Sequence, residues 1–355
     1  MPTLFDPIKI RGLEIKNRAW VSPMCQYSAK EGVIGEWHHV HIGGFAVGGA
    51  GLIIAEATGV VPEGRISIGC PGLYNDAQGD AWAPVVEFAH SMGAAVGIQL
   101  AHAGRKGGTA LPFKGFRMAT PEEGGWETVA PSSIEFEGYP VPHALTVEEI
   151  HAIVKSFGES AKRAIKAGFD LIEIHAAHGY LIHEFYSPLS NQRTDEYGGD
   201  FAGRTKFLKE VVIEVRKSIP DSMPLFVRIS ASDWTEGGWT VEDSVQLSEE
   251  LKSLGVDLID TSSGGNVHNA KITVGPGYQV PFADQIKHGS TIATSAVGMI
   301  TDPHQANEII TSGKADAVML AREMLRNPRW PLYAAGELGA EITWPEAIAR
   351  GKPTK

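Results

Sequence analysis

Short apolar runs and amphipathic segments alternate eight times along the chain. Apolar runs of this kind, bounded by glycine or polar residues, are typical of strands that are buried on both faces of a parallel sheet. The predicted strands are residues 19–24, 52–58, 95–101, 171–175, 225–229, 258–262, 292–296 and 317–321.

The segments between these runs carry apolar residues at helical spacing. One stripe covers residues 150–165, and Gly168 follows it as the expected left-handed end of the helix. Thr240 and Asp243 have the spacing of a capping box, so they predict a helix start. The pattern therefore predicts an amphipathic helical segment after each strand.

Eight strand–helix units predict the α/β class, with a parallel sheet closed into a (β/α)₈ TIM barrel. Residues 1–18 predict a short N-terminal hairpin or plug. Residues 104–144, rich in Gly, Pro and Trp, interrupt the spacing after the third strand and predict a loop or hairpin lid. Since no linker composition appears, we expect residues 1–355 to form a single domain.

A doubly wound dinucleotide-binding fold is the main alternative architecture. Its glycine fingerprint follows the first strand. Here the glycine cluster at residues 43–51 precedes the second strand instead. We interpret this cluster as tight packing at a helix end and reject the dinucleotide-binding site.

Composition narrows the functional class. The formal charge of −11 argues against nucleic acid or an anionic membrane as the main partner. Two cysteines, Cys25 and Cys70, form neither a disulfide framework nor a CxxC metal motif. No apolar run approaches membrane-spanning length, and the N-terminus lacks a signal-peptide core. We therefore expect a cytoplasmic protein without a structural metal.

Polar side chains gather where the predicted strands end, which is where barrel enzymes carry their chemistry. His175 ends the fourth strand, and His178 and Tyr180 follow within five residues. Burying such groups without partners costs a few kcal/mol, so their position indicates a site. A metal-dependent hydrolase or isomerase would use the two histidines as ligands. It would also need carboxylate or lysine ligands, and the ends of strands one, three and five provide none.

The ends of the later strands indicate a phosphate-binding corner. Gly298 follows strand seven and Arg322 follows strand eight, which matches the usual phosphate site of such barrels. Arg228 emerges from a buried strand, so its charge needs an anionic partner. That partner is either a carboxylate of the barrel or an electron-rich cofactor ring. Gln99 offers a donor and an acceptor, which suits the edge of a heterocycle.

Several long motifs resemble those of one enzyme family. They are LFDPIKIRGLEIKNR, SPMCQYSA, EATGVVPEGR, QLAHAGRK, HAAHGYLIHEFYSPLSNQRTDEYGG and AREMLRNPRWPLYAA. With them the chain resembles the Old Yellow Enzyme family of FMN-dependent ene-reductases, and in particular its bacterial thermophilic-like branch. The resemblance covers nearly the whole chain.

The resemblance implies tightly bound FMN, with NAD(P)H as a transient reductant. It implies reduction of an alkene conjugated to a carbonyl or nitro group. The FMN contacts that it implies are Ser22, Pro23, Met24, Cys25, Ala57, Gln99, Arg228, Gly298, Ala321 and Arg322. Ala321 stands where the family often has glycine, and its backbone amide remains available.

The resemblance also implies roles for the substrate-binding residues. His175 and His178 bind the carbonyl oxygen, Tyr180 protonates the α-carbon, and Tyr27 is a wall or second carbonyl contact.

Cys25 is implied to lie near the flavin ring and to tune its potential, which leaves a non-catalytic redox sensor as an alternative function. Arg350 is implied to reach a neighbouring subunit's site in a homodimer or homotetramer.

Overall fold

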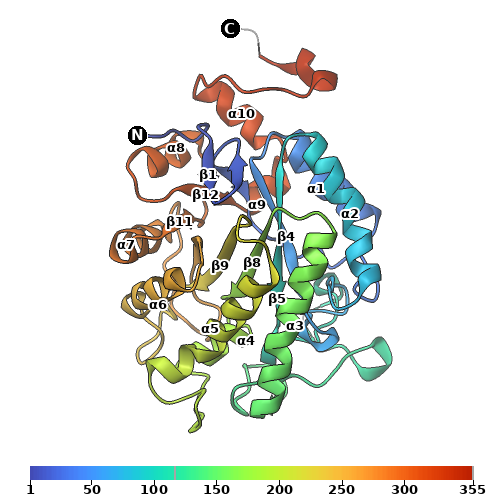
Figure 1. Ribbon diagram of the computed structural model, residues 1–355, viewed down its shortest axis with the longest axis vertical. Coiled ribbons are helices and arrows are strands. Elements are labelled where there is room, and N and C mark those ends of the chain that lie inside the picture. Colours follow the sequence, from blue (N-terminus) through green and yellow to red (C-terminus); the bar gives the residue numbers. More distant parts are fainter. Residues whose placement is uncertain (116, 354–355) are drawn as a thin grey trace.

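The computed structural model describes residues 1–115 and 117–353, and eight of its strands form a closed barrel (Figure 1). The strands follow chain order around the barrel, and neighbouring strands run parallel. The predicted (β/α)₈ architecture is confirmed. The barrel strands are β3 (Ala19–Val21), β4 (Leu52–Gly59), β5 (Ala95–Ala101), β8 (Leu171–Ala176), β9 (Leu225–Ser230), β10 (Leu258–Ser262), β11 (Ala293–Ala296) and β12 (Ala317–Leu320).

Each predicted strand corresponds to one barrel strand, and the first shows the largest difference in length. The prediction extended it to residue 24, whereas β3 ends at Val21. Pro23 has no N–H for the ladder, so regular pairing stops just before it. The residues beyond Val21 are consequently free to line the end of the barrel.

Helices cover the outside of the barrel (Figure 1). They are α1 (Glu36–Val47), α2 (Asp76–Ser91), α3 (Val147–Lys166), α4 (Leu181–Tyr186), α5 (Phe201–Ser218), α6 (Val241–Ser253), α7 (Val280–Ser290), α8 (Pro303–Thr311), α9 (Arg322–Arg326) and α10 (Trp330–Glu337). The predicted capping box starts α6, since Thr240 Oγ1 accepts the Asp243 N–H at 3.2 Å. Gly168 follows α3 with φ 93°, as predicted.

The glycine cluster before β4 packs the end of α1 against the C-terminal part of the chain. A Cβ on Gly48 would lie 1.9 Å from the carbonyl oxygen of Pro328. Only glycine permits this approach, so the predicted packing role is confirmed.

The N-terminal hairpin closes the end of the barrel at which the strands begin. β1 (Ile8–Ile10) and β2 (Leu13–Ile15) pair antiparallel. Ile10 and Ile15 belong to one apolar cluster with Trp20 and Phe226 inside the barrel. Because the hairpin plugs this end, the opposite end remains for the site.

The insertion after β5 lies over that opposite end. It contains the 3₁₀ turns η2 (Gly104–Lys106), η3 (Pro112–Lys114) and η4 (Pro121–Glu123) and the strands β6 (Val129–Ala130) and β7 (His143–Ala144). β6 and β7 pair parallel, whereas Thr109 and Met118 form an antiparallel bridge in the first part of the lid. Residue 116 of the predicted lid, and residues 354–355 of the predicted domain, lie outside the described residues.

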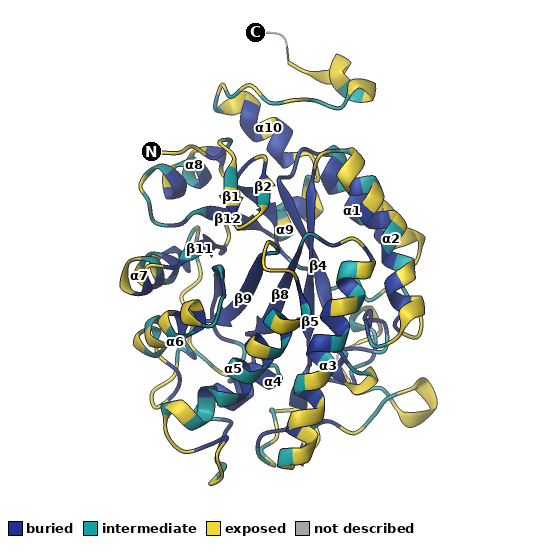
Figure 2. Cartoon of the chain, in the orientation of Figure 1, coloured by how far each residue is buried: buried dark blue, intermediate teal, exposed yellow. Residues whose placement is uncertain are grey.

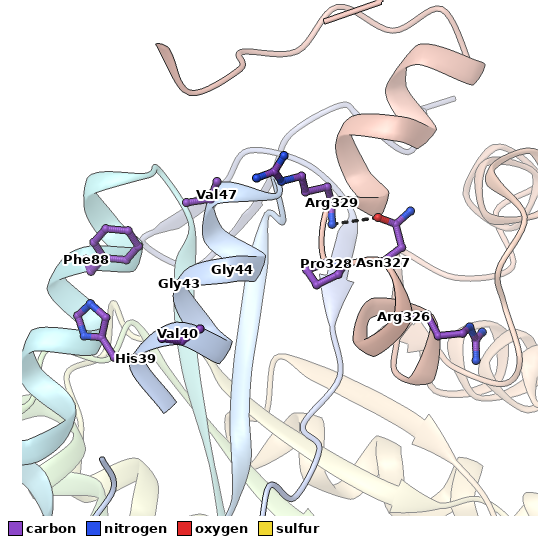
Figure 3. Close-up of a pocket in the computed structure, with 10 residues that line it drawn as sticks. All are labelled: His39, Val40, Gly43, Gly44, Val47, Phe88, Arg326, Asn327, Pro328 and Arg329. Carbon is purple, nitrogen blue, oxygen red and sulfur yellow. Dashed lines mark hydrogen bonds between the residues drawn. The ribbon is translucent and has the colours of Figure 1, made fainter. Parts of the chain in front are cut away.

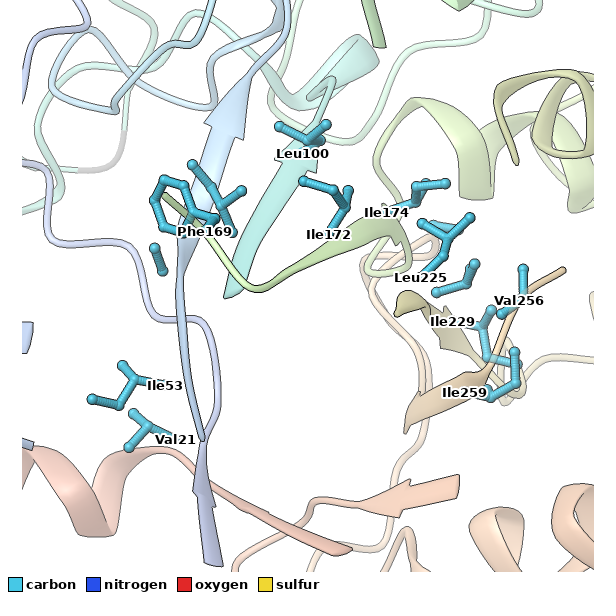
Figure 4. Packing of buried hydrophobic residues seen from close by; sticks show 14 of the residues in the cluster. Val21, Ile53, Leu100, Phe169, Ile172, Ile174, Leu225, Ile229, Val256 and Ile259 are labelled. Atoms are coloured by element: carbon cyan, nitrogen blue, oxygen red, sulfur yellow. The ribbon is translucent and has the colours of Figure 1, made fainter. Parts of the chain in front are cut away.

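The strands and the inward faces of the helices consist of buried residues, so the core lies between these two layers (Figure 2). Figure 4 shows part of this core, which includes Ile53, Ile172, Ile229 and Ile259. These side chains occupy alternate positions along their strands, so their neighbours point into the barrel. Among the described residues, no helix is both long and apolar enough to cross a bilayer.

Candidate active site

The three residues predicted after the fourth strand lie together at the barrel mouth. His175 is in β8, and the turn before α4 carries His178 and Tyr180. The ring centroids of His175 and His178 are 5.1 Å apart, and those of His175 and Tyr180 are 5.0 Å apart. The rings are nearly perpendicular, with interplanar angles of 86° and 82°. The structure therefore brings these side chains into one cluster.

His178 is held by the last residues of β9 and β10 and by the loop after β10. Its φ of 62° lies in the left-handed region, which costs energy for a residue with a side chain. The His178 N–H donates to Ser230 Oγ at 2.9 Å, and His178 Nε2 lies 2.7 Å from Ser262 Oγ. A Cβ on Gly265 would lie 2.6 Å from His178 Cα, so glycine is required there. The surrounding backbone thus fixes this ring.

Both histidines are neutral, and each offers one ring N–H. Burial, and after it the charge of Arg228, lowers the pKa of His175 and of His178 well below the ordinary range. His175 Nδ1 accepts the Ala177 N–H at 3.3 Å, so the proton of this imidazole is on Nε2. Burial raises the pKa of Tyr180 well above its usual range, which keeps the phenol protonated.

Lys106 belongs to the same cluster and was not assigned a role from the sequence. Its Nζ donates to the carbonyl oxygens of His178 at 2.7 Å and Gly265 at 2.8 Å, and it lies 5.2 Å from the centroid of the Tyr180 ring. Burial lowers the pKa of Lys106 to about 8. The lysine joins the lid to two strand-exit loops. The QLAHAGRK motif contains it, but only the fold shows these partners.

A layer of polar side chains lies inside the barrel below the histidines. Arg228 Nε is 3.1 Å from Asp260 Oδ2, and Gln99 Nε2 donates to Glu173 Oε1 at 2.8 Å. The sequence left two possible partners for Arg228, a carboxylate of the barrel or a cofactor ring. Asp260 is such a carboxylate. Burial, followed by the nearby Asp260, raises the pKa of Glu173 to about 8. Sequence reasoning missed both carboxylates, although Glu173 precedes His175 by two residues and so points to the same side of β8.

Buried polar atoms are left without hydrogen bonds at this layer. Among the described residues, neither Ser22 Oγ nor Arg228 Nε has a hydrogen-bond partner of suitable geometry. Buried polar atoms normally have partners, so these two fit the polar edge of a cofactor such as the FMN ring.

The predicted phosphate corner is also assembled. A cavity of about 210 Å³ is lined by Arg228, Gly298, Ala321 and Arg322. Gly298 has φ 137°, which favours glycine, and it leaves the backbone open to the cavity. Arginine beside open backbone suits a phosphate group.

The β3 exit lies beside this layer. Its predicted residues are Ser22, Pro23, Met24, Cys25 and Tyr27. The Ser22 N–H donates to Leu320 O at 3.0 Å, which ties the exit to β12. Cys25, Tyr27 and Tyr180 pack against one buried cluster that contains Ala57. A hydrogen bond to Cys70, and then burial, raises the pKa of the Cys25 thiol well above its usual range.

Arg350 is not part of this assembly within its own chain. It lies in η5 (Glu346–Gly351), is exposed, and belongs to a C-terminal segment that extends away from the barrel (Figures 1 and 2). Its role at a neighbouring subunit stays a prediction.

Comparisons with known proteins agree with this geometry. Residues 3–340 match the model of the NADH:flavin oxidoreductase / NADH oxidase family. The chain is 50% identical over 351 residues to an NADPH dehydrogenase of Geobacillus thermodenitrificans, covering 98% of each chain. The structure resembles morphinone reductase in complex with tetrahydroNAD, with a TM-score of 0.79 and 28% identity over 98% of this chain and 93% of that one. An old yellow enzyme homologue from Zymomonas mobilis has the same score and identity over 100% of both chains.

A parallel barrel with a buried polar layer and an arginine-lined cavity at its mouth fits an FMN-dependent oxidoreductase. The chain belongs to the NADH:flavin oxidoreductase family, the Old Yellow Enzymes, as a bacterial-type member. It is an NAD(P)H-dependent flavin oxidoreductase with FMN as its cofactor.

Proposed function

We propose that this protein is an ene-reductase that reduces alkenes conjugated to a carbonyl or nitro group. The observation that carries the proposal is the cluster of two neutral imidazoles and one neutral phenol at the barrel mouth. Such a set can bind an oxygen that gains negative charge and then supply a proton nearby. The whole chain, residues 1–355, is proposed to act as one FMN-binding domain.

FMN, when bound, supplies the hydride chemistry that links NAD(P)H to the alkene. The side chains that would hold its ring are those of Ser22, Pro23, Met24, Cys25, Ala57, Gln99 and Arg228. Gly298, Ala321 and Arg322 would hold its phosphate. Ser22 Oγ, which has no hydrogen-bond partner among the described residues, supports the first assignment, and the lined cavity supports the second.

The histidines bind and polarise the substrate. His175 Nε2–H donates to the carbonyl or nitro oxygen, and His178 acts beside it. Both stabilise the charge that develops on this oxygen as the β-carbon receives hydride. Because the site is buried, these hydrogen bonds are stronger than they would be in water. Tyr27, at the same cluster, lines the pocket or gives a second contact.

Tyr180 supplies the proton. Its phenol O–H transfers a proton to the α-carbon, which becomes basic as the enolate forms. Lys106, over the face of the Tyr180 ring, stabilises the phenolate that remains. It also fixes the His178 loop through the carbonyl oxygen of His178.

An anaerobic absorbance titration tests the proposal. We expect NADPH to bleach the flavin band of the purified protein and one equivalent of 2-cyclohexenone to restore it. Both half-reactions are then seen in one cuvette. A band that bleaches and does not return would contradict the proposal and would favour the redox-sensor alternative that uses Cys25.

We further propose that the protein forms a homodimer or homotetramer in which Arg350 reaches the neighbouring site. Support comes from the C-terminal segment, which extends beyond its own barrel (Figure 1). A groove of about 490 Å³ between α1 and residues 326–329 is lined by apolar side chains such as Val40 and Phe88 (Figure 3). We infer that this groove belongs to the contact between copies.

Two free cysteines support a reducing, cytoplasmic location.

Replacing Arg350 by alanine tests the shared site. We expect KM for the enone to rise by about tenfold with little change in kcat, because a charge-assisted hydrogen bond contributes about 1.5–3 kcal/mol. Steady-state kinetics measure the change, and Lys352→Ala on the same exposed segment is the matched control. A monomer by light scattering, or equal KM values in the two variants, would contradict the proposed role of Arg350 at a neighbouring site.

A further inference from the structure

A second cysteine lies beside Cys25, in a position that the proposed reaction does not use. Cys70 is fully buried, in the apolar cluster against which Cys25 and Tyr27 pack. Its loop is joined to the segment after β3, since the Ala29 N–H donates to the carbonyl oxygen of Gly69 at 2.9 Å. Cys25 and Cys70 are the two cysteines of the chain, so the fold brings all of its thiols together.

Glu56, in β4, completes a group of three. The Sγ atoms of Cys25 and Cys70 and a carboxylate oxygen of Glu56 all lie within 4.8 Å of one another. The three residues come from the β3 exit, β4 and the loop after β4. Adjacent strands of the barrel therefore direct two sulfur atoms and one oxygen to a common point.

A second layer holds the carboxylate in place. Glu56 Oε2 accepts the Gln26 N–H at 2.8 Å, and Glu56 Oε1 lies 3.2 Å from His38 Nε2. Both side chains of the His38–Glu56 pair are at most 2% exposed. His38 Nε2 has no hydrogen-bond partner of suitable geometry in the described part of the chain. Carboxylates that bind metals are commonly held by hydrogen bonds from a second layer of groups, and the Gln26 N–H provides such a bond to Glu56.

We propose that Cys25, Cys70 and Glu56 form a binding site for a thiophilic divalent cation such as Zn²⁺ or Cd²⁺. Two thiolates and a carboxylate suit these ions, and water or a substrate atom completes the tetrahedron. Bonds of about 2.0–2.3 Å place tetrahedral ligands about 3.3–3.8 Å apart, so small side-chain rotations suffice. As the cation binds, the two S–H bonds break and the protons pass to solvent.

Cation binding has a consequence that rests on the proposed function. Cys25 and Tyr27 belong to the proposed FMN and substrate pocket, so a cation held by Cys25 lies at its wall. A fixed charge and a displaced Cys25 side chain there hinder alkene binding. The site therefore makes enone reduction sensitive to thiophilic cations.

Titration of the FMN-loaded protein with Cd²⁺ tests the site. We expect the ultraviolet charge-transfer absorption of thiolate–Cd²⁺ bonds to rise to one equivalent per chain, and enone turnover to fall in parallel. The absorption reports on this cluster alone, because the chain has no other cysteine. In Cys70→Ser we expect bound FMN and metal-free turnover to be retained. The absorption should weaken, and the Cd²⁺ concentration for half-inhibition should rise by at least ~10-fold.

Two results would overturn the proposal. One is the absence of thiolate–Cd²⁺ absorption in the wild-type protein when both thiols are still reactive after denaturation. The other is a Cys70→Ser protein that titrates like the wild type. If this variant does not fold, protection of both wild-type cysteines from alkylation by Cd²⁺ decides the question. If the protein binds the cation but does not reduce enones, the proposed function is contradicted and the proposed cation site is not.

Discussion

Replacing His175 and His178 together by alanine is expected to leave FMN bound and to lower the rate of enone reduction by at least ~10²–10³-fold. The reason is that both imidazoles are neutral and lie together at the barrel mouth, with their ring centroids 5.1 Å apart. Loss of one preorganised donor to a developing oxyanion already lowers the rate by about 10²–10³-fold. The effects of two donors that act together are not additive. The two residues lie above the polar layer of Arg228 and Gln99, so the variant keeps the side chains proposed to hold the cofactor.

The measurement should isolate the alkene step. The cofactor is reduced chemically, without NAD(P)H, and its reoxidation by 2-cyclohexenone is followed by stopped-flow absorbance. This design matters because the nicotinamide is proposed to use the same pocket. His304→Ala, an exposed substitution in α8, is the control for a general effect of losing a histidine. A double variant that reoxidises at the wild-type rate would disprove the carbonyl-binding role.

Replacing Tyr180 by phenylalanine is expected to slow enone reduction by about 10²–10⁴-fold, the usual contribution of a general acid. The substitution removes one oxygen and keeps the ring, so the packing against His175 and the contact with Lys106 remain. FMN content and bleaching by NADPH should stay close to those of the wild type. The loss therefore falls on protonation of the α-carbon.

The choice of substrate distinguishes a proton donor from a packing residue. A nitronate is a much weaker base than an enolate, so its formation does not depend on an acid to the same extent. We expect Tyr180→Phe to impair a cyclic enone strongly and the matching nitroalkene only weakly. Tyr27→Phe, at the same cluster, is the matched control and should affect both substrates alike. Equal losses for both substrates in Tyr180→Phe would assign the tyrosine to packing.

The strand–helix order could be predicted because it depends on local periodicity. Each buried strand carries a short, mainly apolar run, and Thr240 and Gly168 mark helix ends through contacts within a few residues. Placing His175, His178 and Tyr180 at one site needed only the rule that strand ends of a parallel barrel lie on one side. The β3 boundary was less accurate, since Pro23 stops the ladder inside an apolar run.

The partners of the site residues could not be predicted, because they come from distant parts of the chain. The sequence left the partner of Arg228 open, and the barrel puts Asp260 beside it on the neighbouring strand. Lys106 belongs to an insertion whose path follows no periodicity, yet it contacts the backbone of His178.

By itself, the sequence determined the architecture and the chemical groups available at the barrel mouth, because strand and helix periodicity and chain order are local properties. The tertiary structure alone decided which groups meet. The stagger of the strands around the closed barrel sets which inward-facing side chains share a layer. It pairs Arg228 with Asp260, and the segments after β3 and β4 bring Cys25 and Cys70 to Glu56. These contacts also set the charge states of the site, since burial depends on the whole fold.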